Sequence, residues 1–476
     1  MALSPLFGNI NPTAQKQATS GNYLDFTSGA GNDFSQQYLP EIYEQEIERY
    51  GNRTLSGFLN MVGAEMPMTS DQVVWSEQNR LHISYDACTI AANNDATVTI
   101  QDSDASVGGS KPHAIRVNSL VVILDPATGT EQKAIVKGIT DTTIEAHPFD
   151  SATWAANLVS AAALKVFVFG SEFAKGTAGM SGSVEPSFTQ FSNSPIIIKD
   201  NYSINGSDTA QIGWVEVGTE DGTSGYLWYL KAESETRLRY QDYLEMTLVE
   251  AEKATVTTGI SAGSQGAKGT EGLFAAIASR GNVYGAFPAD LSSFDAILKN
   301  LDGQGAIEEN MLFLDRATNL AFDDMLAGLD GGSTGSGSAY GVFENSEQMA
   351  LNLGFSGFRR GSYDFYKTDW KYLNDASTRG ADSNFSSGEV DAIDGVLIPA
   401  GTSTVYDQIL GTNIRRPFLH VRYRASEADD RRMKTWITGS VGGAYTSDVD
   451  EMRVNFLSER CLCVQGANNF VLLKSV

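Results

Sequence analysis

The sequence is poor in cysteine, in histidine and in positive charge, and it lacks any long hydrophobic run. The three cysteines, Cys88, Cys461 and Cys463, are too few for a disulfide framework in a chain of 476 residues. No stretch approaches the roughly 18 apolar residues of a membrane-spanning helix. The N-terminus has neither the basic start nor the apolar run of a signal peptide. We therefore expect a chain that folds in a cytoplasm and is stabilised by packing and association.

Acidic residues far outnumber basic ones, with 58 Asp+Glu against 34 Lys+Arg and a formal net charge of −24. Nucleic-acid binding is normally driven by lysine and arginine replacing condensed counterions, so sequence-specific DNA binding is not expected. Three arginine pairs, Arg359–Arg360, Arg415–Arg416 and Arg431–Arg432, stand close to acids and are interpreted as paired or solvated surface residues. The charge favours solubility and opposes premature association.

Metal-binding motifs are incomplete. The four histidines form neither an HExxH motif nor a pair at helical spacing. Cys461-x-Cys463 places two thiols on one face of a strand, but no second pair completes a zinc site, so we interpret both as buried apolar cysteines. Asp102-x-Asp104-x-Ser106 begins like a calcium loop, yet Val107 stands where glycine is needed and His113 where glutamate is needed. We predict no bound metal and no cofactor.

Catalytic motifs are equally incomplete. Gly331-Gly-Ser333-Thr-Gly335 satisfies G-x-S-x-G, but no predicted strand leads into it, as a nucleophile elbow requires. Gly263–Gly269 contains Lys268 without the G-K-[ST] of a phosphate-binding loop. The paired acids Asp323–Asp324 and Asp429–Asp430 are interpreted as solvated helix ends. We assign no catalytic, cofactor-binding or metal-binding residue and do not expect an enzyme.

The N-terminal segment differs in composition from the rest of the chain. Residues 1–35 are rich in glycine, asparagine, serine and threonine, and such a segment cannot bury enough surface to fold alone. We interpret it as an arm. Apolar residues in Ser35–Val62 recur with helical spacing, and Pro40 suits a first helical position, so this segment is predicted to be helical. From Asp71 the pattern alternates, which predicts extended strands.

Strand patterns continue between about residues 96 and 170, separated by turns rich in glycine, aspartate, proline and serine. The segments are TVTI, AIRVNSLVVIL, EQKAIVKGI, TTIEA and LKVFVFG. Short strands at this spacing favour a small β-barrel or a β-sandwich, inserted as a compact unit. The next segment, Glu172–Trp214, is predicted to be a long hairpin-like loop with one extended stretch, PIIIKDNYSI.

The clearest single element is Tyr226–Ala254, which contains neither glycine nor proline. It predicts a long helix that packs through an apolar stripe. The residues near this stripe are Leu227, Leu230, Leu238, Leu244, Leu248 and Ala251. Thr255–Thr270, rich in glycine, serine and alanine, is predicted to be a linker.

Helical segments alternate with strands from about residue 270 to residue 411, which predicts an α/β layer domain. The helices are Leu273–Ser279, Ser292–Asn300, Arg316–Leu326 and Ser346–Leu353, and the strands include MLFLD and VLIPA. The tail returns to extended segments, so mostly antiparallel sheet is expected there. Those segments are Phe418–Tyr423, Lys434–Thr438, Arg453–Phe456, Cys461–Val464 and Phe470–Leu473.

This order of elements resembles the major capsid proteins of tailed bacteriophages. Three stretches carry the resemblance: LPEIYEQEIERYGNRTL, GWVEVGTEDGTSGYLWYLKAESETRLRYQDYLEMTLVEAE and DVDEMRVNFLSERCLCVQGANNFVLLK. The inserted VNSLVVILDPATGTEQKAIVKGITDTTIEA is similar to β insertions in some relatives. Within the tailed phages, the resemblance suggests the crAss-like group of gut phages.

The resemblance implies the Hong Kong 97 fold. This α+β fold has an N-terminal arm, an extended E-loop that here carries the small barrel or sandwich insertion, a P-domain with a long spine helix, and an α/β A-domain. The implied boundaries are 1–70 for the arm, 71–221 for the E-loop region with the insertion at about 96–170, 222–260 and 413–476 for the P-domain, and 270–412 for the A-domain.

The resemblance also implies a structural role. Arm and E-loop contacts would join copies of the chain, as pentamers and hexamers, into an icosahedral shell around double-stranded DNA. Expected partners are other copies of the chain, a portal and other capsid or decoration proteins, and DNA that is enclosed without sequence-specific binding; no membrane is expected. Assembly in the host bacterial cytoplasm would place the product in the virion capsid. An acidic multidomain hydrolase and an encapsulin-like cargo compartment are the alternatives.

Overall fold

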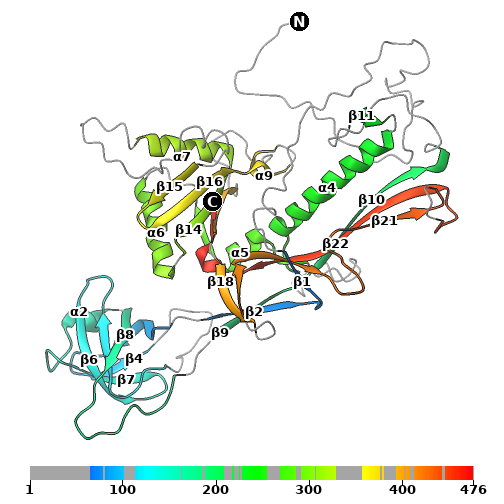
Figure 1. Ribbon diagram of the computed structural model, residues 1–476. Coiled ribbons are helices and arrows are strands. Elements are labelled where there is room, and N and C mark those ends of the chain that lie inside the picture. Colours follow the sequence, from blue (N-terminus) through cyan, green and yellow to red (C-terminus); the bar gives the residue numbers. More distant parts are fainter. Residues whose placement is uncertain are drawn as a thin grey trace. The chain divides into compact units, whose positions relative to one another are not determined.

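Strands outnumber helices in the computed structural model, which has a mixed α/β architecture (Figure 1). The chain forms two units: unit 1 comprises Met1–Trp75 and Ser192–Val476, and unit 2 comprises Ser76–Phe191. The strands β2 (Val73–Gln78) and β9 (Phe188–Asn193) carry the chain between the units and pair with each other. The structure describes residues 65–78, 81–100, 113–161, 163–184, 188–207, 217–218, 224–225, 228–254, 269–285, 291–305, 307–328, 356–375, 378–379, 393–400, 402–407, 412–441 and 445–474.

Unit 2 is a closed barrel with the strand order β3-β4-β7-β6-β5-β8. The strands are β3 (Ser84–Ile90), β4 (Thr97–Thr99), β5 (Ser119–Leu124), β6 (Glu131–Ile139), β7 (Thr143–Pro148) and β8 (Leu164–Ser171). Every second residue faces the interior, so that Gln132, Ala134 and Val136 of β6 are buried. The short helix α2 (Ala156–Ser160) adds Leu158 to the same core.

The barrel is one of the two alternatives that the sequence leaves open for this segment. Its strands β4 to β8 overlap the five predicted segments, and β3 supplies the remaining strand. The alternation along each segment predicts the inward face, and closing the sheet removes the unpaired edges that an open sheet would present.

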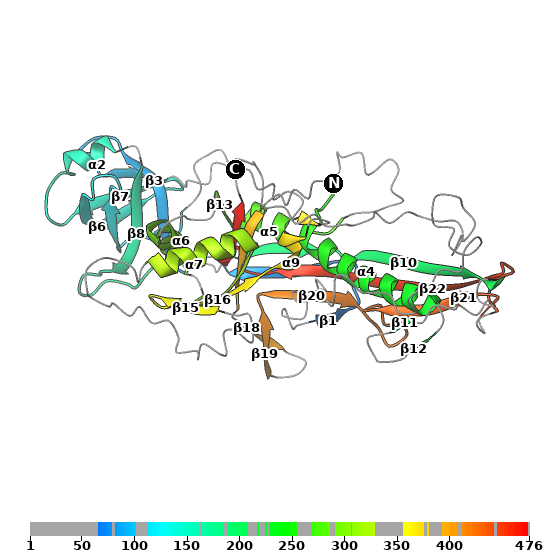
Figure 2. The ribbon, with the colours of Figure 1, turned by 90° about the horizontal axis from the view of Figure 1, so that it is seen from above.

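In unit 1, the long helix α4 (Trp228–Glu250) lies along a mostly antiparallel sheet (Figure 2). Tyr240 and Leu244 of the helix are buried against Val454 and Phe456 of the sheet. The Tyr240 hydroxyl donates to the backbone oxygen of Ile198 at 3.1 Å, and burial raises the pKa of Tyr240 to about 12. The strands are β1 (Glu65–Met68), β20 (Leu419–Arg424), β22 (Glu451–Val464), β10 (Ile196–Asn205) and β21 (Lys434–Gly439).

The helix departs from the prediction in two respects. It ends at Glu250 instead of Ala254, and its 23 residues span about 35 Å at ~1.5 Å per residue. Leu244 is buried as predicted, but Leu238 is 36% exposed. The buried face of the helix contains Tyr240, Leu244 and Leu248, which are spaced four residues apart. Position 238 lies two residues from Tyr240, which places it on nearly the opposite side of the helix.

The second sheet of unit 1 has the order β13-β23-β17-β14-β16-β15. Its strands are β13 (Asn282–Gly285), β14 (Glu309–Leu314), β15 (Ser356–Arg360), β16 (Tyr363–Asp369), β17 (Ile393–Pro399) and β23 (Val471–Lys474). Two helices, α6 (Leu291–Gln304) and α7 (Arg316–Gly328), cover one face. The other face packs against α5 (Leu273–Arg280), α9 (Lys371–Asn374) and the end of α4.

The position of β23 differs from the prediction. The sequence groups Phe470–Leu473 with the antiparallel strands of the tail, whereas β23 runs parallel to β13 and antiparallel to β17. Leu472 packs into the core on the α5 side, and Leu473 packs into the core on the α6 side. An uninterrupted apolar run of this kind needs a sheet that is covered on both faces, which the six-stranded sheet provides.

An ion pair between α6 and β15 gives this sheet a testable pH dependence. Arg360 Nε and Nη2 donate to the two carboxylate oxygens of Asp295 at 2.8 and 2.6 Å, which holds the pKa of Asp295 below its usual value. A group with a lowered pKa stabilises the fold above its unfolded pKa and loses this effect as the pH falls through the folded pKa. We expect Asp295→Asn to lower the thermal unfolding midpoint at pH 7, with a difference from the unaltered chain that shrinks below about pH 4. A difference that is constant from pH 7 to pH 3.5 would contradict the assignment.

Short elements complete the described structure. They are β11 (Val217–Gly218), β12 (Ser224–Gly225), β18 (Thr402–Asp407), β19 (Thr412–Pro417) and the 3₁₀ turn η3 (Ala467–Asn469). Several predictions fall on residues outside the described ranges: the arm at 1–35, the helix at 35–62, most of the linker at 255–270, the G-x-S-x-G motif at 331–335, the helix at 346–353, and the calcium-like segment at 102–106.

Candidate functional site

The cysteines that the sequence analysis weighs as possible metal ligands lie within the described residues, and the calcium-like segment 102–106 lies outside them. In the part of the chain that the structure describes, no three histidine, cysteine or acidic side chains are placed to hold a metal ion. Cys461 and Cys463 are free and fully buried on β22, opposite Arg422 and His420 of β20. The hydrogen bond with Cys463, together with burial, raises the pKa of the Cys461 thiol. This thiol therefore stays protonated and acts as a core side chain.

Among the helices within the described ranges, none combines the length and the apolar character needed to cross a membrane.

Two of the three arginine pairs that the sequence singles out are engaged in ion pairs. Arg359 lies 3.5 Å from Asp364, and Arg360 holds Asp295. Arg431 lies 2.7 Å from Glu459. Arg415 and Arg416 belong to β19. The interpretation as paired or solvated surface residues is confirmed for Arg359, Arg360 and Arg431, and also for Arg432, which pairs with Glu65.

The paired acids are not the helix ends that the sequence suggests. Asp323 lies within α7 and pairs with Lys367, whose side chain is 3% exposed. Asp429 precedes β21 and accepts from Lys434 Nζ at 2.6 Å. Each of the two carboxylates therefore forms an ion pair with a lysine. The local charge pattern of the sequence does not predict these pairs.

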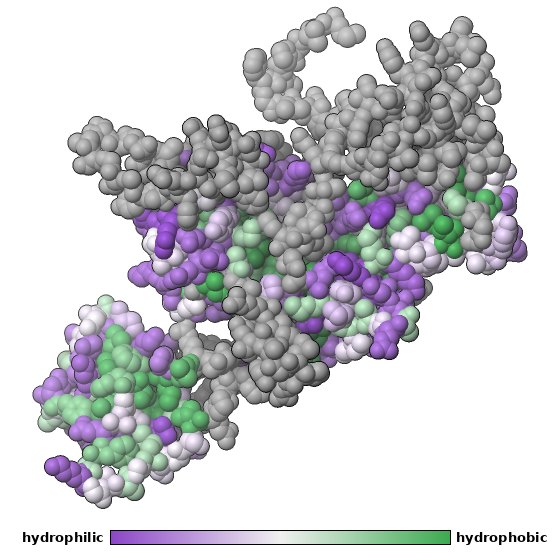
Figure 3. Space-filling model, in the orientation of Figure 1, coloured by the Kyte–Doolittle hydropathy of each residue, from purple (hydrophilic) through white to green (hydrophobic). Residues whose placement is uncertain are grey.

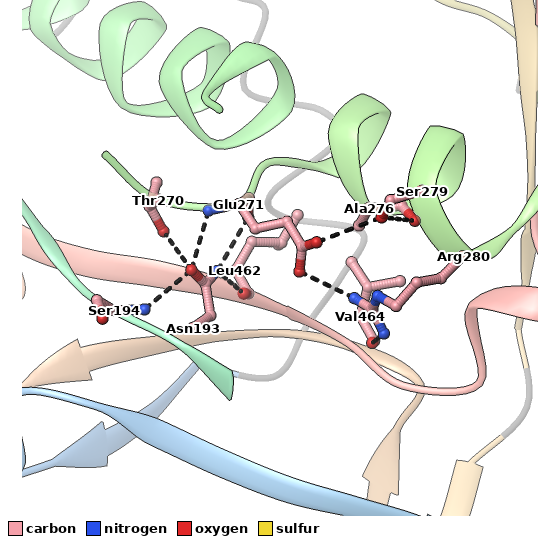
Figure 4. A network of polar contacts seen from close by, with 9 residues as sticks. All are labelled: Asn193, Ser194, Thr270, Glu271, Ala276, Ser279, Arg280, Leu462 and Val464. Atoms are coloured by element: carbon pink, nitrogen blue, oxygen red, sulfur yellow. Dashed lines mark hydrogen bonds and ion pairs between the residues drawn. The ribbon is translucent and has the colours of Figure 1, made fainter. Parts of the chain in front are cut away.

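The chain returns from unit 2 to unit 1 at Asn193, the last residue of β9, whose side chain is 1% exposed. Its amide nitrogen donates to the backbone oxygens of Glu271 and Leu462, at 2.9 and 2.7 Å. Its amide oxygen accepts from the backbone N–H groups of Ser194 and Glu271, both at 2.9 Å, and from the Thr270 hydroxyl at 3.0 Å (Figure 4). This buried amide thus uses both donors and its acceptor, and it ties together three segments that are distant in sequence.

Arg280, at the end of α5, extends the same cluster. Its guanidinium donates to Glu271 Oε2 at 3.0 Å and to the backbone oxygen of Val464 at 3.4 Å. It also lies 5.7 Å from the ring centroid of Trp75 on β2, which is 8% exposed. Since β2 leads out to unit 2 and β9 leads back, both strands are held by residues 270–280 at their unit 1 ends.

A second polar cluster holds β1, the first described strand of unit 1. This strand pairs in parallel with β20 over four residues only. Glu65 pairs with Arg432 and lies 3.4 Å from Nη1 of Arg460, whose side chain is 5% exposed. Burial lowers the pKa of Arg460, and the charge of Glu65 acts in the opposite direction. The Arg460 guanidinium also donates to Ser458 Oγ at 2.8 Å.

Glu459, next to Arg460 on β22, pairs with two further arginines. Its carboxylate lies 3.0 Å from Arg424 Nε and 2.7 Å from Arg431 Nη1, and it is 6% exposed. Arg424 also pairs with Asp71, just after β1. Charges of opposite sign therefore surround the point where β1 joins the sheet, and two of them, Glu459 and Arg460, are buried.

Removing Glu65 should destabilise unit 1. We expect Glu65→Ala to lower the free energy of unfolding by about 1–3 kcal/mol, because Arg460 is left buried without its main opposing charge. Urea unfolding at pH 7 measures the effect, which should persist in high salt because the pair is largely shielded from solvent. Glu427→Ala removes an exposed carboxylate nearby and should change stability by less than about 0.5 kcal/mol. Equal effects of the two substitutions would contradict this assignment.

Sequence reasoning missed both clusters. Asn193 stands in the segment FSNSP, and nothing in that segment distinguishes a buried amide from a turn asparagine. Glu65 and Arg460 lie at opposite ends of the chain and meet only because β1 and β22 both flank β20. A weak signal does exist in FLSERCLCV, where Glu459 and Arg460 stand between the apolar residues of the second half of β22.

No protein-family model matches the sequence, and no curated protein matches it. The chain is similar to the capsid of a native GTA particle, with 8% identity and a TM-score of 0.40 over 95% of this chain and 99% of that chain. It is similar to a protein of Gordonia phage Cozz, with 8% identity and a TM-score of 0.38 over 97% and 98%. It is also similar to a chain of the cyanophage Pam1 capsid, with 11% identity and a TM-score of 0.37 over 64% and 82%.

Proposed function

We propose that the protein is the major capsid protein of a tailed bacteriophage and forms an icosahedral shell from copies of itself. The observation that carries this proposal is the packing of α4 along β10 and β22, strands that come from distant parts of the chain. The same β22 continues into the core that joins this sheet to the six-stranded α/β sheet. A long helix on a long sheet, beside an α/β layer, is the arrangement that the sequence resemblance implies for a Hong Kong 97-type subunit.

The proposal assigns the parts of the chain as the sequence suggests. Residues 1–70 form the arm, 71–221 the E-loop region with its inserted barrel, 222–260 with 413–476 the P-domain, and 270–412 the A-domain. The strand β23 falls in the sequence range of the P-domain, but it pairs with β13 and β17 inside the sheet of the A-domain. This contribution of a strand by one domain to the sheet of the other supports a subunit whose P-domain and A-domain move together as one rigid body. Membership of the crAss-like group stays a prediction from the sequence.

Assembly would rest on many weak contacts between copies. Each subunit in a closed shell touches several neighbours, so modest pairwise affinities add up to a stable container and still permit correction. The net charge of −24 keeps free subunits apart and makes assembly sensitive to ionic strength. Double-stranded DNA would be enclosed without specific binding, and a portal and decoration proteins would be the other partners, all within the host cytoplasm.

Electron microscopy tests the proposal. The full chain, expressed alone or with phage-encoded assembly factors and examined in negative stain, should form closed shells or ring-shaped capsomers. Raising the salt concentration should shift the distribution towards shells by screening the acidic surface. A monodisperse monomer under all of these conditions would contradict a capsid function.

A further inference from the structure

We propose that unit 2 binds unit 2 of a second copy of the chain through the outer face of β5 and its neighbours β6 and β8. The two copies are related by a two-fold axis along β5, so that Glu131 of each copy faces Lys165 of the other. The inference concerns a contact between two barrels, and it does not rest on the proposed function.

The strand β5 is apolar on both of its faces. Val121 and Ile123 point into the barrel core, and Leu120, Val122 and Leu124 alternate with them on the outer face. Along most of β6, by contrast, exposed residues alternate with buried ones. An uninterrupted apolar run is typical of a strand that is covered on both faces. The barrel interior covers the inner face of β5, and the second copy would cover the outer face.

The register of the barrel places further apolar residues on the same outer face. Val122 is opposite Lys133 of β6 and Phe167 of β8. Leu120 is opposite Ile135 of β6. Directly opposed residues of neighbouring strands share a face. Val122 is 5% exposed, whereas Leu120, Ile135 and Phe167 are half-buried, so the centre of this face is closely packed and its margin is open to solvent.

Two exposed phenylalanines border this face. Phe169 of β8 is 49% exposed and stands next to Gly170, which is opposite Leu120. Phe149 is 55% exposed, and its backbone N–H donates to the Lys133 oxygen at 3.0 Å. Hydrophobic residues gather on the face of unit 2 that Figure 3 shows. Association would remove exposed apolar surface of this kind from water, which favours binding.

The charged residues of this face suit a contact between two identical copies. Leu124 is opposite Glu131 of β6 and Lys165 of β8, so an acid and a lysine flank the same apolar residue. Glu131 is exposed, and the Lys165 side chain is 41% exposed and lies 3.5 Å from Asp86. The two acids, Glu131 and Asp86, balance the two lysines, Lys133 and Lys165. Because the whole chain carries a charge of −24, a face with balanced charges is where two copies can approach with little repulsion.

A two-fold axis along β5 brings opposite charges together. Rotation about this axis places β6 of one copy over β8 of the other and leaves β5 over β5. Since Glu131 and Lys165 stand at the level of Leu124, each Glu131 then faces Lys165 of the second copy. At the next level Lys133 faces the ring of Phe167 of the second copy, which allows a cation–π contact. The strands of the two sheets stay aligned, as in ordinary packing of one sheet on another.

Site-directed cross-linking of the full chain tests the contact. Leu124 lies on the proposed axis, so two Leu124→Cys copies face each other across about 10 Å, which a short bismaleimide can span. Thr97→Cys is the matched control, because Thr97 is exposed on β4, which lies farthest from β5 in the strand order of the barrel. The native cysteines within the described residues are buried and do not compete. Leu124→Cys should form cross-linked dimers at least about tenfold faster than Thr97→Cys. Equal rates would overturn the proposal.

Charge reversal tests the symmetry of the contact. Glu131→Lys or Lys165→Glu alone places like charges opposite each other twice in each dimer, and should slow the cross-linking of the Leu124→Cys chain by at least about fivefold. The chain with both reversals restores both attractions and should return to within about twofold of the original rate. A mixture of the two single variants, on chains of different mass, should cross-link between unlike chains. Rates that do not respond to these reversals would overturn the proposal.

Other occupants of the face predict different results. A segment of the same chain that covers β5 would protect Leu124→Cys from a monofunctional maleimide. A different protein would leave this cysteine reactive but without cross-linked dimers. Either result overturns the proposal.

A second pair of variants keeps the test independent of Leu124. Should Leu124→Cys fail to fold, Glu131→Cys and Lys165→Cys replace residues at the surface, and a mixture of these two chains should cross-link faster than either chain alone. No difference between the mixture and the single chains would count against the contact. The cross-link reports this contact whether or not shells form, so a lack of shells in electron microscopy would contradict the proposed function alone.

Discussion

Deleting residues 1–34 is expected to give a folded subunit that no longer forms closed particles. This segment is too polar and too rich in glycine to contribute a core of its own, so under the proposed function its contribution would lie in contacts with other copies. Because every subunit of a shell would lose the same contact, the loss multiplies over the whole particle. In size-exclusion chromatography the full chain should elute as particles, and the truncated chain should elute as capsomers or monomers.

Controls separate assembly from folding. The strand β1 begins at Glu65, so every described contact lies beyond the deletion, and the thermal unfolding midpoints of the two unassembled chains should agree within about 2 °C. A chain in which residues 1–34 are replaced by a glycine and serine tract of equal length distinguishes the arm's side chains from its mere length. Particles of normal size from the truncated chain would contradict the role of the arm in assembly.

The sequence predicts elements well where one periodicity dominates. The strands β4 to β8 are recognisable because alternating side chains face the barrel interior, and α4 because its segment lacks glycine and proline. Helices α5, α6 and α7 agree with their predicted segments to within a few residues. Patterns of this kind arise because one face of the helix or strand is buried. They can be recognised in each segment without knowledge of the other segments.

Pairing between distant segments is not predictable in the same way. The register of β10 on β22, and the place of β23 between β13 and β17, depend on contacts that form only in the folded chain. The candidate clusters have the same origin. The bonds that Asn193 makes to Leu462 and Glu271 come from backbone groups whose positions no motif encodes.

For charged residues, the sequence predicts that a residue is paired but does not predict its partner. Acids near the arginine pairs indicate that these arginines are paired, and the structure confirms the pairing for Arg359, Arg360 and Arg431. The partners, however, are often not the neighbours in sequence: Arg360 pairs with Asp295, and Arg431 with Glu459. Composition therefore indicates that charges are neutralised, and tertiary structure decides by which residue.

Replacing Phe456 with alanine is expected to lower the free energy of unfolding by about 3–5 kcal/mol, the range for removing a buried aromatic ring. Phe456 is 2% exposed on β22 and stacks on Tyr240 of α4 with ring centroids 5.6 Å apart. The cavity would lie where the long helix meets the sheet, so the surrounding side chains cannot collapse into it without moving α4. Urea unfolding, monitored by circular dichroism, measures the loss.

Leu238→Ala provides the matched control, because this leucine lies on the same helix but is 36% exposed. It should change stability by about 0.5 kcal/mol or less, since this position is exposed and outside the buried core. Tyr240→Phe isolates the polar part of the contact: it keeps the stacked ring and removes the hydrogen bond to Ile198, for an expected loss of about 1 kcal/mol. The order Phe456→Ala, Tyr240→Phe, Leu238→Ala is expected only if α4 is docked on β22. Similar values for all three would mean that the helix does not rest on this sheet in solution.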